Sequence, residues 1–246
     1  MVSLIKRNLS MAIIPIILFH PDPDDNIVIT AYQAGAEDFI YGDWKEKLIE
    51  VRIRKIIERS RRDMSINPST HLPGPSIIEH ELSEHIINNT ECAVGYADLD
   101  NFKAYNDYYG YFYGDSIIRL TARIIKDVVF DICREGFVGH IAGDDYIFIV
   151  PKDKFESISK AIIKTFDALI RMKYDDADLD RGFITTSNRK GETEEFPILT
   201  ISIAVILNSR GMFSHVGEMS KMLADLKKAT KMKSGSNYMV ERRTKY

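Results

Sequence analysis

Two pairs of aspartates have the residue types and spacing for phosphoryl chemistry. Asp98 and Asp100 lie at the end of a predicted strand over residues 93–99, and Asp144 and Asp145 lie at a turn between two apolar runs. Side chains two residues apart on a strand share a face, so Asp98 and Asp100 are expected to project toward one site. Carboxylates at the ends of adjacent strands suit a pair of Mg²⁺ ions, which prefer oxygen ligands and can stabilise the attacking and leaving oxygens of a phosphoryl transfer.

Each aspartate pair alone is weak evidence, because Asp-x-Asp is common and Gly-Asp-Asp in a hairpin is ordinary turn chemistry. The combination is more specific. Residues 98–110 read DLDNFKAYNDYYG, residues 113–115 read YGD, and residues 142–146 read AGDDY. In these motifs and their separation the chain resembles the GGDEF family of nucleotidyl cyclases, from about residue 67 to the C-terminus.

The resemblance implies a reaction, a cofactor and a role for each matching residue. It implies a diguanylate cyclase that condenses two GTP molecules into cyclic di-GMP as a homodimer, with two Mg²⁺ ions or, alternatively, Mn²⁺. A carboxylate at Asp115 can accept two N–H groups from guanine, which favours GTP over ATP. The implied site consists of metal ligands (Asp98, Asp144 and the Leu99 carbonyl), catalytic residues (Asp144, Asp145 and Lys103) and substrate-binding residues (Phe102, Asn106, Asp115, Lys231 and Lys233).

The chain departs from the family pattern at several positions. Asp145 replaces a Glu and shortens the side chain by one methylene, and Ala142 replaces a Gly. Ser236 replaces an Arg that would bind phosphate, with Lys231 and Lys233 as substitutes. One alternative is therefore a catalytically degenerate module that binds GTP or a protein partner in signalling. Another is a related cyclase that makes a different cyclic oligonucleotide.

Activity is favoured over degeneracy on one physical ground. Clustered carboxylates at a buried site repel one another unless a cation lies between them. A domain that had lost its metal ions would have little physical reason to retain Asp98 and Asp144. The retained acids therefore favour an active cyclase.

These residues need a sheet to position them. The expected fold is α/β: a palm-like domain with a central mixed, mainly antiparallel sheet flanked by helices. A helix is predicted over residues 77–88 and another over about 155–172. A hairpin is predicted within residues 173–195, followed by a strand over 198–206.

The first 62 residues alternate strand and helix and precede a linker at 63–75 and the cyclase-like domain at 76–246. Strands are predicted at 13–19 and 38–41, and helices at 26–34 and 45–62. This βαβα segment resembles the second half of a response-regulator receiver domain and lacks the half that carries the phospho-acceptor Asp. A dimer face, a signalling helix and an upstream signalling partner are implied.

Composition limits the class of protein. The net charge of −3 and pI near 6.1 do not suggest a nucleic-acid binder. The two cysteines have no CxxC spacing, which favours a reduced compartment. The apolar run at 11–19 is too short to span a bilayer. A cytoplasmic protein that binds neither nucleic acid nor membrane is expected.

Overall fold

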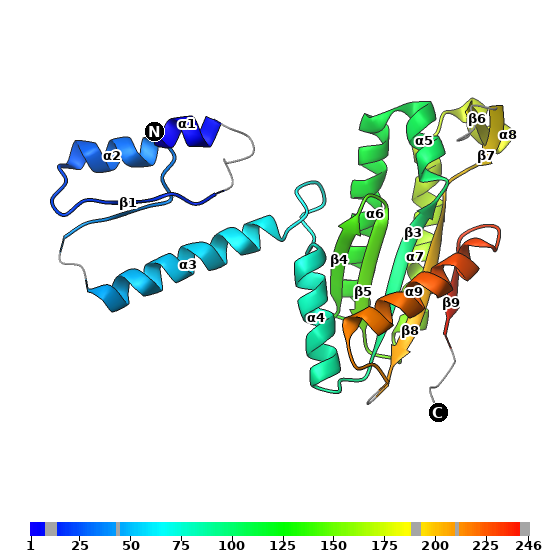
Figure 1. Ribbon diagram of the computed structural model, residues 1–246. Helices are drawn as coiled ribbons and strands as arrows, with labels where there is room; N and C mark the ends of the chain where they lie inside the picture. Colours follow the sequence, from blue (N-terminus) through cyan, green and yellow to red (C-terminus); the bar gives the residue numbers. More distant parts are fainter. Residues whose placement is uncertain (8–13, 43–44, 188–192, 210–211, 242–246) are drawn as a thin grey trace. The chain divides into compact units, whose positions relative to one another are not determined.

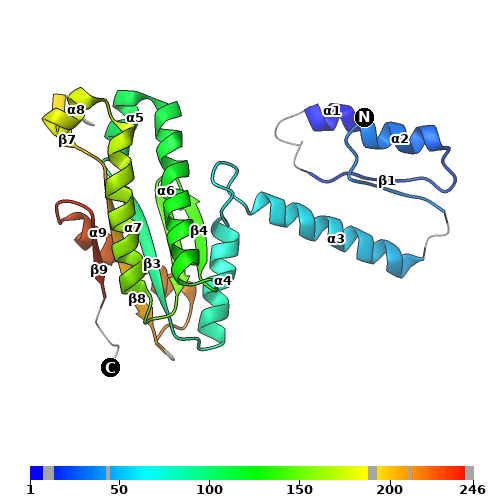
Figure 2. The ribbon, with the colours of Figure 1, turned by 180° about the vertical axis from the view of Figure 1, so that it is seen from behind.

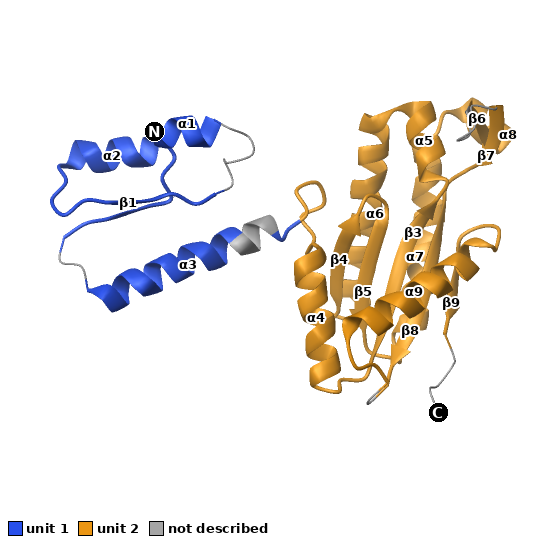
Figure 3. Cartoon of the chain, in the orientation of Figure 1, with its two compact units in different colours: residues 1–66 blue, residues 67–246 orange. Residues whose placement is uncertain are grey.

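The computed structural model describes residues 1–7, 14–42, 45–187, 193–209 and 212–241. The chain divides into two compact units, Met1–Ile66 and Asn67–Tyr246 (Figure 3). None of the described helices is long and apolar enough to cross a membrane.

The first unit has the predicted β-α-β-α order, with one further helix before it. Its two strands pair in parallel, and a small core forms from Ala31, Ala36 and Phe39. The described strand begins at residue 17 rather than 13, and residue 13 lies outside the described part. The elements are α1 (Val2–Arg7), β1 (Ile17–Phe19), α2 (Asp25–Gln33), β2 (Asp38–Ile40) and α3 (Glu46–Met64).

The second unit contains a five-stranded sheet in the order β4-β5-β3-β8-β9. All neighbouring pairs are antiparallel except β8 and β9, which are parallel. The predicted mixed, mainly antiparallel sheet is therefore confirmed. Its strands are β3 (Cys92–Asp100), β4 (Phe137–Ala142), β5 (Asp145–Val150), β8 (Thr200–Asn208) and β9 (Asn237–Val240).

Helices cover both faces of this sheet (Figures 1 and 2). On one face, α6 (Tyr111–Ile132) and α7 (Phe155–Ile170) pack on residues such as Ala97 and Leu99 of β3. On the other, α4 (Pro75–Ile87) and α9 (Val216–Lys231) pack on a second core that includes Val94. Because successive strand residues face opposite sides, Asp98 lies on the α4 and α9 face.

Shorter elements complete the second unit. Helix α5 (Phe102–Tyr109) follows β3, and a 3₁₀ turn (Arg171–Lys173) and α8 (Asp176–Arg181) follow α7. The predicted hairpin is formed by β6 (Phe183–Ser187) and β7 (Thr193–Pro197), which pair antiparallel. Its expected turn at residues 190–191 lies outside the described residues.

Candidate active site

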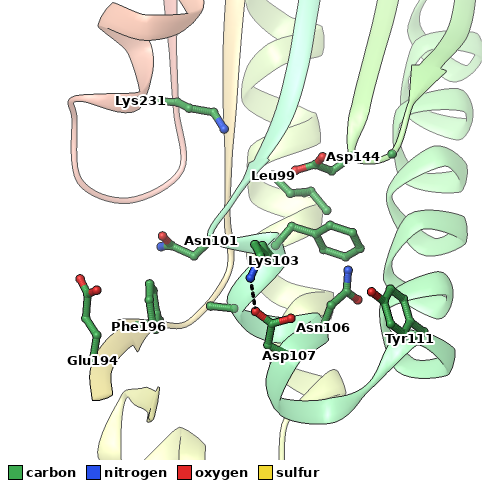
Figure 4. Close-up of a pocket in the computed structure, with 13 residues that line it drawn as sticks. Leu99, Asn101, Lys103, Asn106, Asp107, Tyr111, Asp144, Glu194, Phe196 and Lys231 are labelled. Carbon is green, nitrogen blue, oxygen red and sulfur yellow. Dashed lines mark hydrogen bonds and ion pairs between the residues drawn. The ribbon is translucent and has the colours of Figure 1, made fainter. Parts of the chain in front are cut away.

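A pocket of about 810 Å³ lies where β3 ends and α5 begins (Figure 4). It is lined by six of the residues predicted for the site, namely Leu99, Phe102, Lys103, Asn106, Asp144 and Lys231. Tyr111 of α6, Gly143 of the turn between β4 and β5, and Glu194 and Phe196 of the strand at 193–197 are among the other lining residues. The fold therefore brings most of the predicted site residues to one concave surface.

The turn between β3 and α5 depends on one residue with an unusual backbone conformation. Asn101 has φ +61° and ψ +19°, in the left-handed region. Asn tolerates this conformation better than most residues with a side chain. The strand therefore passes directly into the helix, and Phe102, Lys103 and Asn106 are presented around the pocket.

Asn106 carries an unused acceptor. Its Oδ1 atom is buried and has no hydrogen-bond partner among the described residues. Gly114 of α6 packs directly against it, since a Cβ atom placed at Gly114 would lie 1.5 Å from this oxygen. A buried acceptor without a donor is costly, and a ligand N–H or O–H group would reach this oxygen only if the Asn106 amide turned toward the pocket that its side chain lines.

Two predicted substrate-binding residues lie outside the pocket lining. Asp115 accepts a hydrogen bond from Ser69 Oγ at 3.1 Å and another from Arg119, one turn further along α6. Lys233 is exposed, on the connection between α9 and β9. Asp115 adjoins Gly114, which packs against the pocket residue Asn106.

The Ala-Gly-Asp-Asp turn joins β4 to β5. Gly143 has φ +57°, which a side chain would strain, whereas Ala142 is not among the residues with positive φ. The substitution of Ala142 for Gly is therefore tolerated by the backbone. Asp144 lines the pocket, and burial raises the pKa of its carboxyl above the ordinary value.

The His140 side chain connects this turn to Thr70. Its Nε2 lies 2.9 Å from the Gly143 carbonyl oxygen and its Nδ1 lies 3.0 Å from Thr70 Oγ1. The ring stacks on Tyr146 at 4.7 Å between centroids. The buried imidazole therefore acts as a structural clamp.

Asp98 and Asp145 face one another across β3 and β5. Lys227 of α9 lies between them: its Nζ contacts Asp98 Oδ2 and lies 2.7 Å from Asp145 Oδ1. Burial raises the pKa of Asp98 to about 7. Burial also acts to raise the pKa of Asp145, but hydrogen bonds with Asp98 and Lys227 outweigh it and hold that pKa below its usual range.

Lys231 lies one turn after Lys227 and reaches the same acids. Its Nζ is 2.5 Å from Asp98 Oδ1 and 3.9 Å from Asp100 Oδ1. Asp100 Oδ2 in turn accepts hydrogen bonds at 2.8 Å from the hydroxyls of Thr200 and Ser202 on β8. As predicted from the strand period, Asp98 and Asp100 share a face, and both meet the same ammonium group.

Two further polar residues are already paired. Lys103 forms an ion pair with Asp107 at 2.5 Å on the exposed side of α5 (Figure 4). Ser236, at the position of the family's Arg, accepts a hydrogen bond from Ile201 N at 3.0 Å and donates one to Asp167 Oδ1 at 2.5 Å. Ser236 therefore anchors the connection before β9 rather than binding a ligand.

Three residues of the site were not predicted from the sequence: Lys227, Glu194 and Phe196. Lys227 precedes Lys231 by four residues, but Lys228 precedes it by three, so spacing alone does not distinguish the two lysines. Glu194 and Phe196 reach the pocket from β7. Nothing in their local sequence indicates this, because their position depends on how the hairpin folds back on α5.

The carboxylates fit a divalent cation in donor type. The pKa values of Asp98 and Asp144 are both raised by burial, so their charged forms are incompletely compensated. The described residues contain no group of three or more His, Cys, Asp or Glu side chains arranged to hold a metal ion. An ion here would depend on further ligands such as nucleotide phosphates, as Mg²⁺ sites commonly do.

Comparison with known proteins gives one family. The family model described as "Diguanylate cyclase, GGDEF domain" matches residues 64–187, about half of the chain. Cyclic di-GMP phosphodiesterase PdeR of Escherichia coli (strain K12) is 39% identical over 69 residues, which are 27% of this chain and 10% of that protein. Diguanylate cyclase VdcA of Vibrio cholerae is 25% identical over 101 residues, 41% of this chain and 29% of that protein.

Solved structures agree on the fold. The coiled coil and GGDEF domain of DgcB from Caulobacter crescentus, solved in complex with c-di-GMP, superposes with a TM-score of 0.56 at 21% identity. The match covers 80% of this chain and 96% of that one. At this identity the likeness concerns the fold alone. The matches to the two curated relatives span less than a third of either protein.

Proposed function

Because the match over residues 64–187 shows that the chain belongs to the GGDEF family, we propose that residues 67–246 bind GTP and condense two GTP molecules into cyclic di-GMP. The observation that carries the proposal is the pocket that joins the unused Asn106 acceptor to the carboxylate of Asp144. Asn106 at one end of the pocket can recognise a nucleobase, and the Asp144 carboxylate at the other end can accept a hydroxyl proton.

Guanine recognition falls to Asn106 and Asp115. The Asn106 oxygen needs a donor, and the guanine ring offers N–H groups that adenine lacks at the same edge. Asp115 would accept two such donors in place of the hydroxyl of Ser69. The phosphates would lie near the start of α5, beside Lys103 and the backbone of Phe102, with Lys231 and Lys233 as further cations.

Asp98, Asp144, Asp145 and the Leu99 carbonyl are the residues that would hold Mg²⁺, or Mn²⁺ as the alternative. When bound, the cation would neutralise charge on the phosphates and on the oxygens that attack and leave. Asp144 has a second role of its own. Because its carboxylate lines the pocket, it would take the 3′-hydroxyl proton as a base, directly or through the bound cation.

The reaction requires two pockets. The 3′-oxygen of each GTP forms a bond to the α-phosphorus of the other, each hydroxyl loses its proton, and each α-phosphorus releases pyrophosphate. One subunit holds one GTP, so two subunits face each other as a homodimer. The first 66 residues would act as a receiver-like half unit that favours this dimer and connects it to an upstream partner in the cytoplasm.

One observation favours a second function, a GTP-binding module without turnover. Clustered acids need a nearby positive charge, and Lys227 already supplies one between Asp98 and Asp145 without a metal ion. Retained carboxylates therefore do not by themselves argue for catalysis. Such a module would keep the Asn106 pocket and signal through GTP occupancy.

The test is product formation from GTP. Purified protein is incubated with GTP and Mg²⁺, and cyclic di-GMP and pyrophosphate are separated by chromatography and identified by mass. We expect product from the wild type and none from Asp144→Ala, while Asp131→Ala, an exposed aspartate of α6, keeps full activity. Binding of GTP without product would overturn the cyclase and leave the second function. Absence of both product and binding would overturn both functions.

A further inference from the structure

Lys227 is held between the carboxylates of Asp98 and Asp145, and its side chain is only 24% exposed. It comes from α9, whose residues pack on the face of the sheet that carries Asp98. Its Nζ contacts both Asp98 and Asp145 and lies 4.7 Å from the centroid of the Tyr96 ring, over its face. Three groups therefore hold one ammonium in place, two by charge and one by a cation–π contact.

The two aspartates require such a partner. The Asp98 side chain is only 4% exposed and lies opposite Asp145 in the β3–β5 register. Like charges directly opposite one another on a sheet destabilise it. An ammonium between them removes this repulsion, and Lys231 adds a second positive charge at the other oxygen of Asp98.

The two ammonium groups occupy the oxygens that a cation would need. Lys227 Nζ contacts Asp98 Oδ2 and lies 2.7 Å from Asp145 Oδ1, and Lys231 Nζ lies 2.5 Å from Asp98 Oδ1. Both oxygens of Asp98 therefore already meet an ammonium group. A divalent cation that bound the same oxygens would lie against two positive charges, which repel it in a partly buried space.

We propose that Lys227 is an internal counterion that competes with divalent metal ions for Asp98 and Asp145, so that metal binding requires this ammonium to leave. The inference rests on the same carboxylates as the proposed function. It does not require catalysis, because Lys227 would compete with metal ions in an active cyclase and in a GTP-binding module alike.

The competition predicts a gain of metal binding when the lysine is removed. We would titrate Mn²⁺ alone, without nucleotide, into the full chain and follow bound ion by electron paramagnetic resonance. Lys227→Met should bind Mn²⁺ about tenfold more tightly than the wild type, because the competing charge is gone. Lys228→Met is the matched control, since Lys228 is the next residue and its side chain is 83% exposed. It should bind Mn²⁺ as the wild type does.

Two further variants locate the effect. Lys227→Arg keeps the positive charge and should retain weak Mn²⁺ binding. Asp98→Asn in the Lys227→Met background should abolish the gain. If Lys227→Met is poorly folded without metal, its melting temperature should rise on adding Mn²⁺ by more than that of the wild type.

The outcomes separate this inference from the cyclase. Equal Mn²⁺ affinity in the wild type and Lys227→Met, or a gain that survives Asp98→Asn, would overturn the counterion. A melting temperature of Lys227→Met that does not respond to Mn²⁺ would overturn it as well. None of these readings depends on GTP or on product, so a protein that makes no cyclic di-GMP can still confirm the competition.

Discussion

At the scale of single residues, Gly114 controls the position of Asn106. Any side chain at this helix position would meet the Asn106 amide, because even a methyl group would lie 1.5 Å from its Oδ1. The absence of a Cβ atom at Gly114 of α6 therefore allows the Asn106 side chain to take its position at the pocket. Substitution here tests base recognition without touching the carboxylates.

Gly114→Ala should weaken GTP binding by about tenfold, since the displaced Asn106 loses a hydrogen bond to the base. The measurement is the dissociation constant for GTP by calorimetry. Ser116→Ala, two residues further along α6, should bind GTP as the wild type does. Unchanged affinity in Gly114→Ala would show that Asn106 does not contact the nucleotide.

Residue identity is also where the sequence argument was strongest. Motifs with fixed spacing identify Asp98, Asn106 and Asp144 in the sequence. In the structure Asn106 and Asp144 line one pocket, together with Leu99, the residue that follows Asp98. The ion pairs of Asp98 with α9 were not predictable in this way. They depend on side chains whose sequence separation from Asp98 exceeds one hundred residues.

At the scale of elements, the segment before α4 is tied to the β4–β5 turn. His140 N donates to the Pro73 carbonyl at 2.8 Å, and its ring contacts Thr70 and Gly143. Asn67 Oδ1 accepts from the backbone N–H groups of Ser69 and Thr70, at 2.9 and 3.1 Å. The first residues of the domain therefore support the turn that carries Asp144.

The clamp predicts a pH dependence of stability. Burial lowers the pKa of His140, against the Gly143 carbonyl and the charges of Asp145 and Asp144, which raise it. The pKa of His140 is therefore lower in the folded state than in the unfolded state, where it is near 6.5. The neutral ring contributes its full stabilisation at pH values above 6.5, and this stabilisation is lost as pH falls through the folded pKa. The wild type should therefore lose more stability between pH 8 and pH 5.5 than His140→Gln.

Urea unfolding at the two pH values measures this difference. At pH 8, His140→Gln should be less stable than the wild type by about 1–3 kcal/mol, because contacts of the buried ring are lost. His80→Gln, an exposed position on α4, is the control and should follow the wild type. Parallel pH profiles for the wild type and His140→Gln would contradict the clamp.

The elements themselves were largely predictable. Apolar runs and turn residues indicate β3, β5 and β8, and helical spacing indicates α3 and α7. Helix α9 shows where such reasoning ends. Its sequence contains adjacent lysines, Lys227 and Lys228, and only the rotation of the packed helix decides which one reaches the sheet.

At the scale of the whole molecule, each unit has a core made of its own residues. The second unit has apolar clusters on both faces of its sheet, and the first has a small cluster around Phe39. Cores that are complete within one unit allow it to fold independently. We therefore expect residues 67–246 to unfold cooperatively and to bind GTP without residues 1–66.

The dimer is tested by dilution. If two pockets must meet, the rate of cyclic di-GMP formation per subunit should rise with protein concentration until dimers saturate. Removing residues 1–66 should move this rise to higher concentration if the first unit favours the dimer. Sedimentation over the same range gives the oligomeric state. A rate per subunit that does not change on dilution, in a protein that sediments as a monomer, would contradict the homodimer.

The lysine between Asp98 and Asp145 also bears on how the protein matures. Many metal-binding domains fold only once their ion arrives, because their acids repel one another until then. Here the opposing charge is synthesised as part of the polypeptide and arrives when α9 docks on the sheet. We therefore expect the domain to reach its native state in the presence of a chelator.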